Sequence, residues 1–229
     1  MKREESVSFD AHDYDQRYRD GYGVAYPESH IIRIHKLILE PELGISGGSV
    51  FDFGCGTGAH LRYFAAHSFV PFGCDTSATA IGRCRASMPE FRDHFFVTPV
   101  HPDLKSLRPD CTVDVFLANQ VLYYLEDDAI RRTVAQAYEL IRPGGVFIAT
   151  MMSYSCWYAR HITGEVGDFK RVELTTTRQP PVTLVNFKTR ESLSDLFQPF
   201  RKLHIGSYGS WIREEEGSTD HWIFVGVRD

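Results

Sequence analysis

Apolar runs alternate with amphipathic stretches through the middle of the chain, and this alternation predicts its architecture. Five runs are largely apolar, which is typical of strands buried on both faces of a parallel sheet: residues 50–53, 70–75, 94–97, 113–118 and 146–150. The stretches between them repeat apolar positions every three or four residues, most clearly over 127–141, as an amphipathic helix does. Strands that alternate with helices indicate an α/β sheet with right-handed crossovers.

The flanking regions follow other patterns. An apolar helical period runs over 28–40 before the first strand, whereas regular periodicity is lost over 153–189. A helix at 191–200 then precedes two strands at 202–208 and 221–227, and an acidic turn joins these strands, so we expect an antiparallel edge pair. The sequence therefore predicts a Rossmann-like, seven-stranded, mostly parallel sheet with an antiparallel C-terminal hairpin and helices on both faces.

The 229 residues are predicted to form one domain with a substantial core. The irregular segment contains one loosely alternating strand at 182–187 and follows the fifth strand of the sheet. Loop-rich insertions beyond the carboxyl ends of the strands commonly build the substrate pocket of α/β enzymes. We divide the chain into an N-terminal lid and helix (1–45), a ligand-binding core (48–150), a substrate-side insertion (153–189) and a C-terminal helix and hairpin (190–229).

Composition restricts the partners and the compartment that we expect. The net charge is −5 and no long Lys/Arg block is present, which argues against a nucleic-acid partner. No apolar run reaches the roughly 20 residues of a membrane span, and the charged residues 1–5 do not resemble a signal peptide. The five scattered cysteines suit reduced thiols better than disulfides or a zinc site. We expect a cytoplasmic protein; composition does not decide its oligomeric state.

Candidate chemistry concentrates in the turn after the first strand, which reads Asp52-x-Gly54-x-Gly56-x-Gly58. Glycines at these places let backbone amides approach a nucleotide-like ligand closely. The run Gly54-x-Gly56-x-x-Ala59 also fits the dinucleotide fingerprint, with an acid, Asp75, at a distance suited to a ribose. An NAD-dependent oxidoreductase is therefore one hypothesis.

Three features favour a different ligand. The glycines stand at alternate positions after Asp52, the run Arg142-Pro143-Gly144-Gly145 precedes the fifth strand, and the chain finishes with an antiparallel pair. Together these residues resemble the class I S-adenosylmethionine-dependent methyltransferases, by motif over about residues 48–150 and by layout over the C-terminal hairpin. In detail the chain looks like the small-molecule group that includes the ubiquinone-biosynthesis type enzymes. The resemblance implies an enzyme with S-adenosylmethionine as its cofactor.

The resemblance also implies a set of cofactor-binding residues. The first motif, beside the methionine part and the ribose, corresponds to Asp52, Gly54, Cys55, Gly56 and Gly58. An acid that accepts hydrogen bonds from the ribose hydroxyls corresponds to Asp75, with Thr76 next to the adenine; strand-end acids that only cap turns are the alternative interpretation. The third motif, at the adenine amino group, corresponds to Asp103 and Leu104, although an acid after a proline is often just a turn former.

Further positions are implied at the two ends of the cofactor. The resemblance places Asn119 at the methionyl amine, Leu122 near the adenosyl group and Arg33 at the cofactor carboxylate. The tyrosines at 14, 18, 22 and 26 recur every four residues, which puts the first two or three on one helical face. This stripe either packs on the main domain or forms a lid, with Tyr14 or Arg17 reaching a ligand.

The acceptor side is less defined by sequence. Methyl transfer requires alignment of the acceptor with the methyl group, and a hydroxyl acceptor also requires a general base. We single out His161, which lies in the irregular insertion, as a candidate base, and Tyr123, beyond the fourth strand, as a residue that orients the acceptor or belongs to the core. No Asn-Pro-Pro-Tyr or Asp-Pro-Pro-Tyr run follows the fourth strand, which argues against methylation of DNA bases or glutamine.

No His/Cys/Asp cluster has metal-ligand spacing, so we expect no metal-assisted route. We expect a small organic or glycan-like acceptor, with O-methylation slightly preferred over N-methylation. A protein that binds S-adenosylmethionine without turnover is the second alternative, beside the NAD-dependent oxidoreductase.

Overall fold

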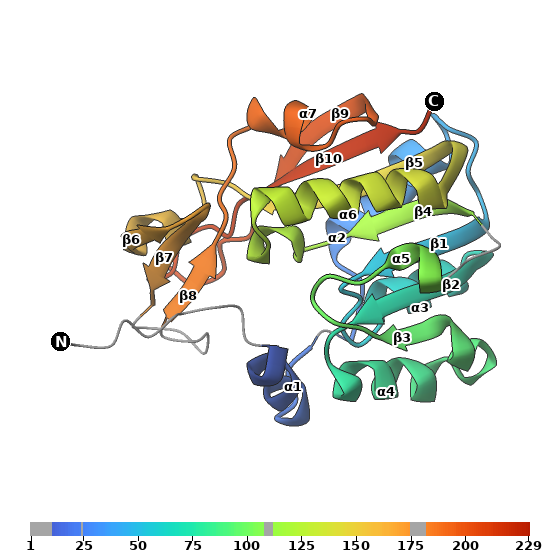
Figure 1. The fold of residues 1–229 in the computed structure, drawn as a ribbon, viewed down its shortest axis with the longest axis horizontal. Helices are drawn as coiled ribbons and strands as arrows, with labels where there is room; N and C mark the ends of the chain where they lie inside the picture. Colours follow the sequence, from blue (N-terminus) through green and yellow to red (C-terminus); the bar gives the residue numbers. More distant parts are fainter. Residues whose placement is uncertain (1–10, 24, 108–111, 175–181) are drawn as a thin grey trace.

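A seven-stranded sheet forms the centre of the computed structural model, which describes residues 11–23, 25–107, 112–174 and 182–229. The strand order is β3-β2-β1-β4-β5-β10-β9 (Figure 1). Neighbouring strands from β3 to β5 pair in parallel, whereas β10 is antiparallel to both β5 and β9. The strands are β1 (Gly48–Phe53), β2 (Phe69–Asp75), β3 (Phe95–Val97), β4 (Val113–Ala118), β5 (Ile141–Met152), β9 (Arg201–Tyr208) and β10 (His221–Val227).

Helices cover both faces of this sheet, and each face has its own core. Successive side chains of a strand point to opposite faces, so Val50 packs on one side and Phe51 on the other. On the Phe51 side, Phe116 and Phe147 continue a row of stacked rings. Its helices are α5 (Leu104–Leu107), α6 (Asp127–Leu140) and α7 (Ser192–Leu196), and those of the Val50 side are α2 (Ser29–Ile34), η1 (His35–Leu39), α3 (Ala59–Ala65) and α4 (Ala78–Ser87).

A second, three-stranded antiparallel sheet lies beyond the carboxyl ends of the parallel strands (Figure 1). It follows the short helix η4 (Trp157–His161) and consists of β6 (Ile162–Val166), β7 (Phe169–Glu173) and β8 (Val182–Val185). The sequence predicted only the strand at β8. Charged residues such as Glu165 and Lys170 hide the alternation in β6 and β7, where Val172 is a buried exception.

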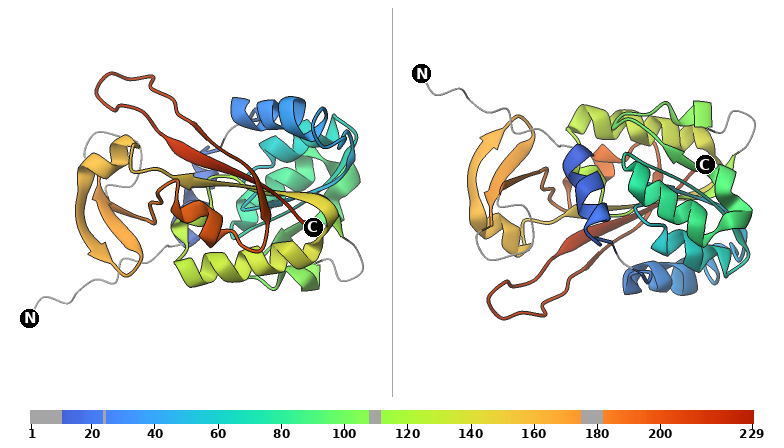
Figure 2. Two further views of the ribbon diagram at one scale, coloured as in Figure 1. Left: turned by 90° about the horizontal axis from the view of Figure 1, so that it is seen from above. Right: turned by 90° about the horizontal axis from the view of Figure 1, so that it is seen from below.

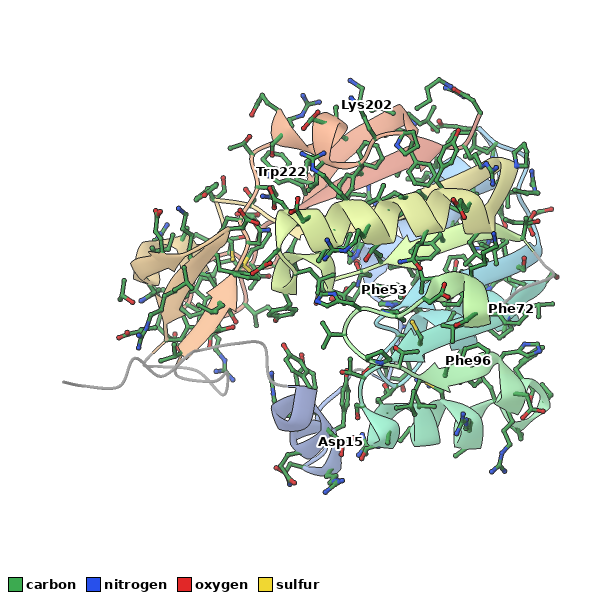
Figure 3. The ribbon with its side chains drawn as sticks, viewed as in Figure 1. Asp15, Phe53, Phe72, Phe96, Lys202 and Trp222 are labelled. Carbon is green, nitrogen blue, oxygen red and sulfur yellow. The ribbon has the colours of Figure 1, made fainter. Side chains whose placement is uncertain are left out.

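The N-terminal helix α1 (Ala11–Arg19) is docked on the start of α4. Asp15 accepts hydrogen bonds from the backbone amide of Thr79 (2.9 Å) and from the hydroxyl of Ser77, which itself caps α4 (Figure 3). Arg83 of α4 donates to the carbonyl oxygens of Tyr18 and Tyr22. These contacts hold α1 over the carboxyl ends of the parallel strands.

The predicted fold class is confirmed, and the differences are local. The helix expected at 191–200 is reduced to α7, because Pro199 lacks the backbone N–H that a longer helix needs. The short helices η2 (Pro89–His94) and η3 (Leu122–Tyr124) were not expected.

The connection between β9 and β10 projects from the body and exposes Trp211 (Figure 2). Within the described ranges, no helix has the length and apolar character that crossing a membrane requires.

Candidate active site

The Gly-rich turn joins β1 to α3 at the edge where the parallel strands end. Gly54 and Gly56 both adopt positive φ angles, of 74° and 52°. A Cβ on Gly54 would lie 2.5 Å from the Val121 side chain, and one on Gly56 would lie 2.8 Å from the hydroxyl of Tyr18. The turn therefore needs glycine both for its backbone conformation and for close approach.

Gly58 has a different role from the other two glycines. Its φ is 76°, and a Cβ there would lie 2.9 Å from the Cys84 sulfur and 3.0 Å from the end of Met88. Gly58 thus allows the start of α3 to pack against α4, on the side of the turn away from the strand ends. Cys55 is buried in the turn, and its thiol lies beside the carbonyl oxygen of Gly56.

Two adjoining cavities surround this turn and together form a cleft. The first lies between the ends of β2, β3 and β4, and the second, of about 750 Å³, lies between the turn and α1. That volume is typical of a small-molecule site. Both cavities are lined by the same central residues: Tyr14, Tyr18, Gly54, Gln120 and Tyr124.

Asp75 ends β2 at the first cavity, next to Thr76. Its carboxylate accepts hydrogen bonds from the backbone amides of Gly56 and Ser77, both at 2.9 Å. Burial raises the pKa of Asp75, whereas these two amides oppose the shift. Asp75 therefore stabilises the turn from one side and borders the cavity on the other.

Asp52 lies one layer behind the cleft. It is 1% exposed, and its Oδ2 lies 3.7 Å from Nδ1 of His60, which lines the second cavity from the first turn of α3. Burial raises the pKa of Asp52. The imidazole of His60 thus lies between Asp52 and the second cavity.

A polar network lies opposite the turn, where β4 meets the start of α2. The Glu28 carboxylate accepts hydrogen bonds from Asn119 Nδ2 (2.8 Å) and from Gln120 Nε2 (2.9 and 3.1 Å). The side-chain oxygen of Asn119 accepts from His30 Nε2 (2.8 Å). Gln120 holds a positive φ of 55°, and its backbone amide donates to the Thr150 hydroxyl at 2.7 Å. Three elements are joined at this point of the cleft.

The structure places several predicted residues around the cleft. Tyr14 and Tyr123 line the second cavity, and the Tyr14 ring meets Tyr124 edge-on at 5.8 Å. Burial raises the pKa of both Tyr14 and Tyr123. Tyr18, from the same stripe as Tyr14, is buried against the turn. The tyrosine stripe therefore packs on the domain and also walls the cleft.

Other predicted residues lie elsewhere. Leu122 and Leu104 are buried in the core, and Asp103 is exposed before α5, where it accepts from the amide of Lys105. Arg33 is exposed and borders a different groove, beside β9. His161 packs edge-on against Trp157, with ring centroids 5.1 Å apart, in η4. The structure does not bring these side chains to the two cavities.

Sequence reasoning did not identify two groups of residues that line the cleft. Thr98, Pro99 and Val100 follow β3 and border the first cavity, at the place expected for Asp103. Their position directly after a predicted strand was the available signal. Gln120 follows the predicted fourth strand and carried the same signal, whereas Glu28 and His60 gave none, because the fold alone brings them to the cleft.

Comparison with known proteins agrees with this geometry. A family model described as a methyltransferase domain matches residues 51–147, from the middle of β1 to β5. Residues 51–147 of the chain are therefore similar to a methyltransferase domain. The predicted resemblance to S-adenosylmethionine-dependent methyltransferases, drawn from the Gly-rich turn, Asp75 and the run before β5, is confirmed. The narrower likeness to the ubiquinone-biosynthesis type enzymes stays a prediction.

Curated and solved proteins are similar to this chain. A carboxy-S-adenosyl-L-methionine synthase of Yersinia pestis (strain Pestoides F) is 29% identical over 131 residues, which cover 53% of this chain and 48% of the relative. The chain thus spans about half the length of that curated relative. An S-adenosylmethionine-dependent methyltransferase from Clostridium acetobutylicum ATCC 824 superposes with a TM-score of 0.66, at 12% identity, over 95% of this chain and 96% of that one.

A third similar protein is the Burkholderia thailandensis 1,6-didemethyltoxoflavin-N1-methyltransferase, solved with 1,6-didemethyltoxoflavin and S-adenosylhomocysteine. Its TM-score is 0.63 at 19% identity, over 95% of this chain and 86% of that one. At such identities the solved structures establish the fold. The family match favours S-adenosylmethionine as the cofactor, and the comparisons do not support the NAD-dependent oxidoreductase.

Proposed function

We propose that the chain transfers a methyl group from S-adenosylmethionine to a small organic acceptor. The observation that carries the proposal is the cleft, which combines the Gly-rich turn, Asp75 and a wall of tyrosines next to an open volume. The first cavity is walled by apolar side chains such as Phe53 and Val121, with Asp75 and Thr76 at its border. This combination suits a nucleoside, whose base prefers apolar walls and whose hydroxyls require an acceptor.

The residues of the second cavity suit the amino-acid end of the cofactor and the acceptor. Gly54 and Gly56 present backbone without side chains, and Glu28 and Asn119 face them from α2 and β4. When bound, S-adenosylmethionine supplies an activated methyl group on a sulfonium. The protein must then orient the acceptor and exclude water, which α1 does by covering the cleft.

The tyrosines support a flat or partly apolar acceptor. Tyr14, Tyr22 and Tyr124 form edge-to-face contacts at ring distances of 5.8 to 6.4 Å, as aromatic side chains prefer. Burial raises the pKa of Tyr124 to about 12, so its hydroxyl remains protonated at neutral pH and can donate a hydrogen bond. Such a donor can orient an acceptor, and O-methylation remains our preference over N-methylation.

Transfer of a labelled methyl group tests this proposal directly. The purified chain is incubated with methyl-tritiated S-adenosylmethionine and a small-molecule metabolite extract, and we expect labelled product together with S-adenosylhomocysteine. S-adenosylmethionine or S-adenosylhomocysteine should also raise the melting temperature, whereas NAD(H) should not. Stabilisation by NAD(H) alone would contradict the proposal, and cofactor binding without any labelled product would favour the non-catalytic binding protein.

A further inference from the structure

We propose that Glu28 forms the subsite that binds the ammonium group at the methionyl end of the cofactor. The inference rests on the proposed function and assigns a residue outside the glycine turn to its cofactor. Glu28 precedes α2 and lies far from the turn in sequence, yet it lines the same cavity as Gly54 and Gly56.

The position of the Glu28 carboxylate is fixed by its hydrogen bonds. Asn119 and Gln120 at the end of β4 donate their side-chain amides to it at 2.8 to 3.1 Å. Each carboxylate oxygen accepts about two hydrogen bonds, so capacity for a further donor remains. The side chain of Glu28 is 30% exposed, and it lines the second cavity. The carboxylate is therefore held in place and still open to a ligand.

Within the described ranges, the carboxylate of Glu28 has no lysine or arginine as an ion-pair partner. Among the described residues, ion-pair distances up to 4.0 Å join Glu28 only to His30 (3.6 Å) and His60 (4.0 Å). Burial lowers the pKa of His30, which favours its neutral form. A partly buried carboxylate held by neutral amides favours a cationic ligand, and a primary ammonium can donate three hydrogen bonds.

The other acids near the turn are less available to an ammonium group. Asp75 lines the first cavity and not the second, and Asp52 is buried behind His60. The side-chain oxygen of Asn119, expected from sequence at the methionyl amine, accepts from His30 instead. Asn119 then acts as a positioning residue, which holds the Glu28 carboxylate through its amide.

Binding of two related ligands tests the assignment. S-adenosylhomocysteine carries the ammonium group, whereas 5′-methylthioadenosine keeps the nucleoside and thioether but lacks the amino acid. By calorimetry, Glu28→Gln should bind S-adenosylhomocysteine about tenfold to a hundredfold more weakly, as the loss of a charge-assisted hydrogen bond implies. Its affinity for 5′-methylthioadenosine should stay within about twofold of the wild type. Glu214→Gln, an exposed acid on the β9–β10 connection, is the matched control and should change neither affinity.

A measurement on the wild type keeps the test independent of how the variant folds. The deaminated analogue of S-adenosylhomocysteine should bind the wild type about tenfold or more weakly than the parent ligand. Unchanged binding of S-adenosylhomocysteine by Glu28→Gln, equal loss of both ligands, or equal affinity of the wild type for the parent and deaminated ligands would overturn the assignment. Failure of the wild type to bind either nucleoside ligand would instead refute the proposed function.

Discussion

At the scale of single residues, three carboxylates near the Gly-rich turn differ because their surroundings differ. Asp52 is sealed behind an imidazole, Asp75 is held by backbone amides, and Glu28 is held by side-chain amides at the cavity surface. Burial raises the pKa of Asp52 and of Asp75. The same functional group is thus a buried side chain at Asp52, a turn anchor at Asp75 and a cavity-lining acceptor at Glu28.

The two hydrogen bonds of Asp75 give a specific expectation. Asp75→Ala should weaken binding of S-adenosylhomocysteine by about 1–3 kcal/mol, since the nucleoside loses its acceptor and the amides of Gly56 and Ser77 lose theirs. Calorimetry measures the change, and Asp128→Ala, at an exposed position of α6, is the control. Wild-type affinity in Asp75→Ala would remove Asp75 from the site.

The residue scale also shows where sequence reasoning is sufficient. The glycines and Asp75 lie within one strand-turn-helix-strand unit, so their spacing alone predicted a common site. Glu28 is separated from Asn119 by 91 positions and from Gln120 by 92, so only the packing of α2 beside β4 brings them together. Local motifs can be predicted from sequence, whereas contacts that depend on tertiary packing cannot.

At the scale of elements, hydrogen bonds attach α1 to α4. Asp15 supplies an acceptor to the first turn of α4, in addition to the Ser77 cap. The hydrogen bond from Ser77 lowers the pKa of Asp15 to about 2, so the carboxylate stays ionised at neutral pH. Tyr14 and Tyr18 of α1 depend on this attachment for their positions over the turn.

Removal of that attachment should open the cleft without unfolding the sheet. In Asp15→Ala, backbone amides of residues 11–19 should exchange faster with deuterium, and cofactor affinity should fall several-fold. Hydrogen exchange read by mass spectrometry gives the first quantity and calorimetry the second. For the exchange measurement Asp20→Ala is a useful comparison, because Asp20 lies just after the helix and, among the bonds that the structure describes, joins only Gln16. Unaltered exchange in α1 would mean that apolar contacts hold it.

Elements differ in how well sequence predicts them. The strands β1, β2, β4 and β10 were located within two residues, since apolar runs and glycine breaks mark them. The small sheet was missed except for β8, because β6 and β7 contain charged residues and bury little. An element with one solvated face and no deep core leaves a weak pattern.

At the scale of the whole molecule, buried histidines couple stability to pH. Burial lowers the pKa of His30, His35 and His221, so each binds a proton in the unfolded chain, near pH 6.5, before it does so in the folded one. Their contribution to stability is present above that pH and is lost as pH falls. Asp52 and Asp75, with raised pKa values, act in the opposite direction.

A variant isolates one of these contributions. His221 is 4% exposed and its Nδ1 lies 2.8 Å from the Thr219 carbonyl oxygen. His221→Gln removes one proton-binding difference, so the fall in unfolding free energy between pH 6.5 and 5 should become shallower, by at most about 1.4 kcal/mol per pH unit. Urea unfolding at several pH values measures the slope, with His204→Gln at an exposed position as the control. Parallel curves for His221→Gln and the wild type would exclude this role.

The place of β10 in the sheet has a consequence for synthesis of the chain. β10 pairs along β5, from Val146 to Met152, and about 70 residues separate Met152 from its partner His221. On a ribosome that adds about 5–20 residues each second, the edge of β5 therefore remains uncovered for roughly 4–14 seconds. An apolar edge without its neighbour invites pairing with other chains. During this interval, a chaperone that shields strand edges would protect the nascent protein from pairing with other chains.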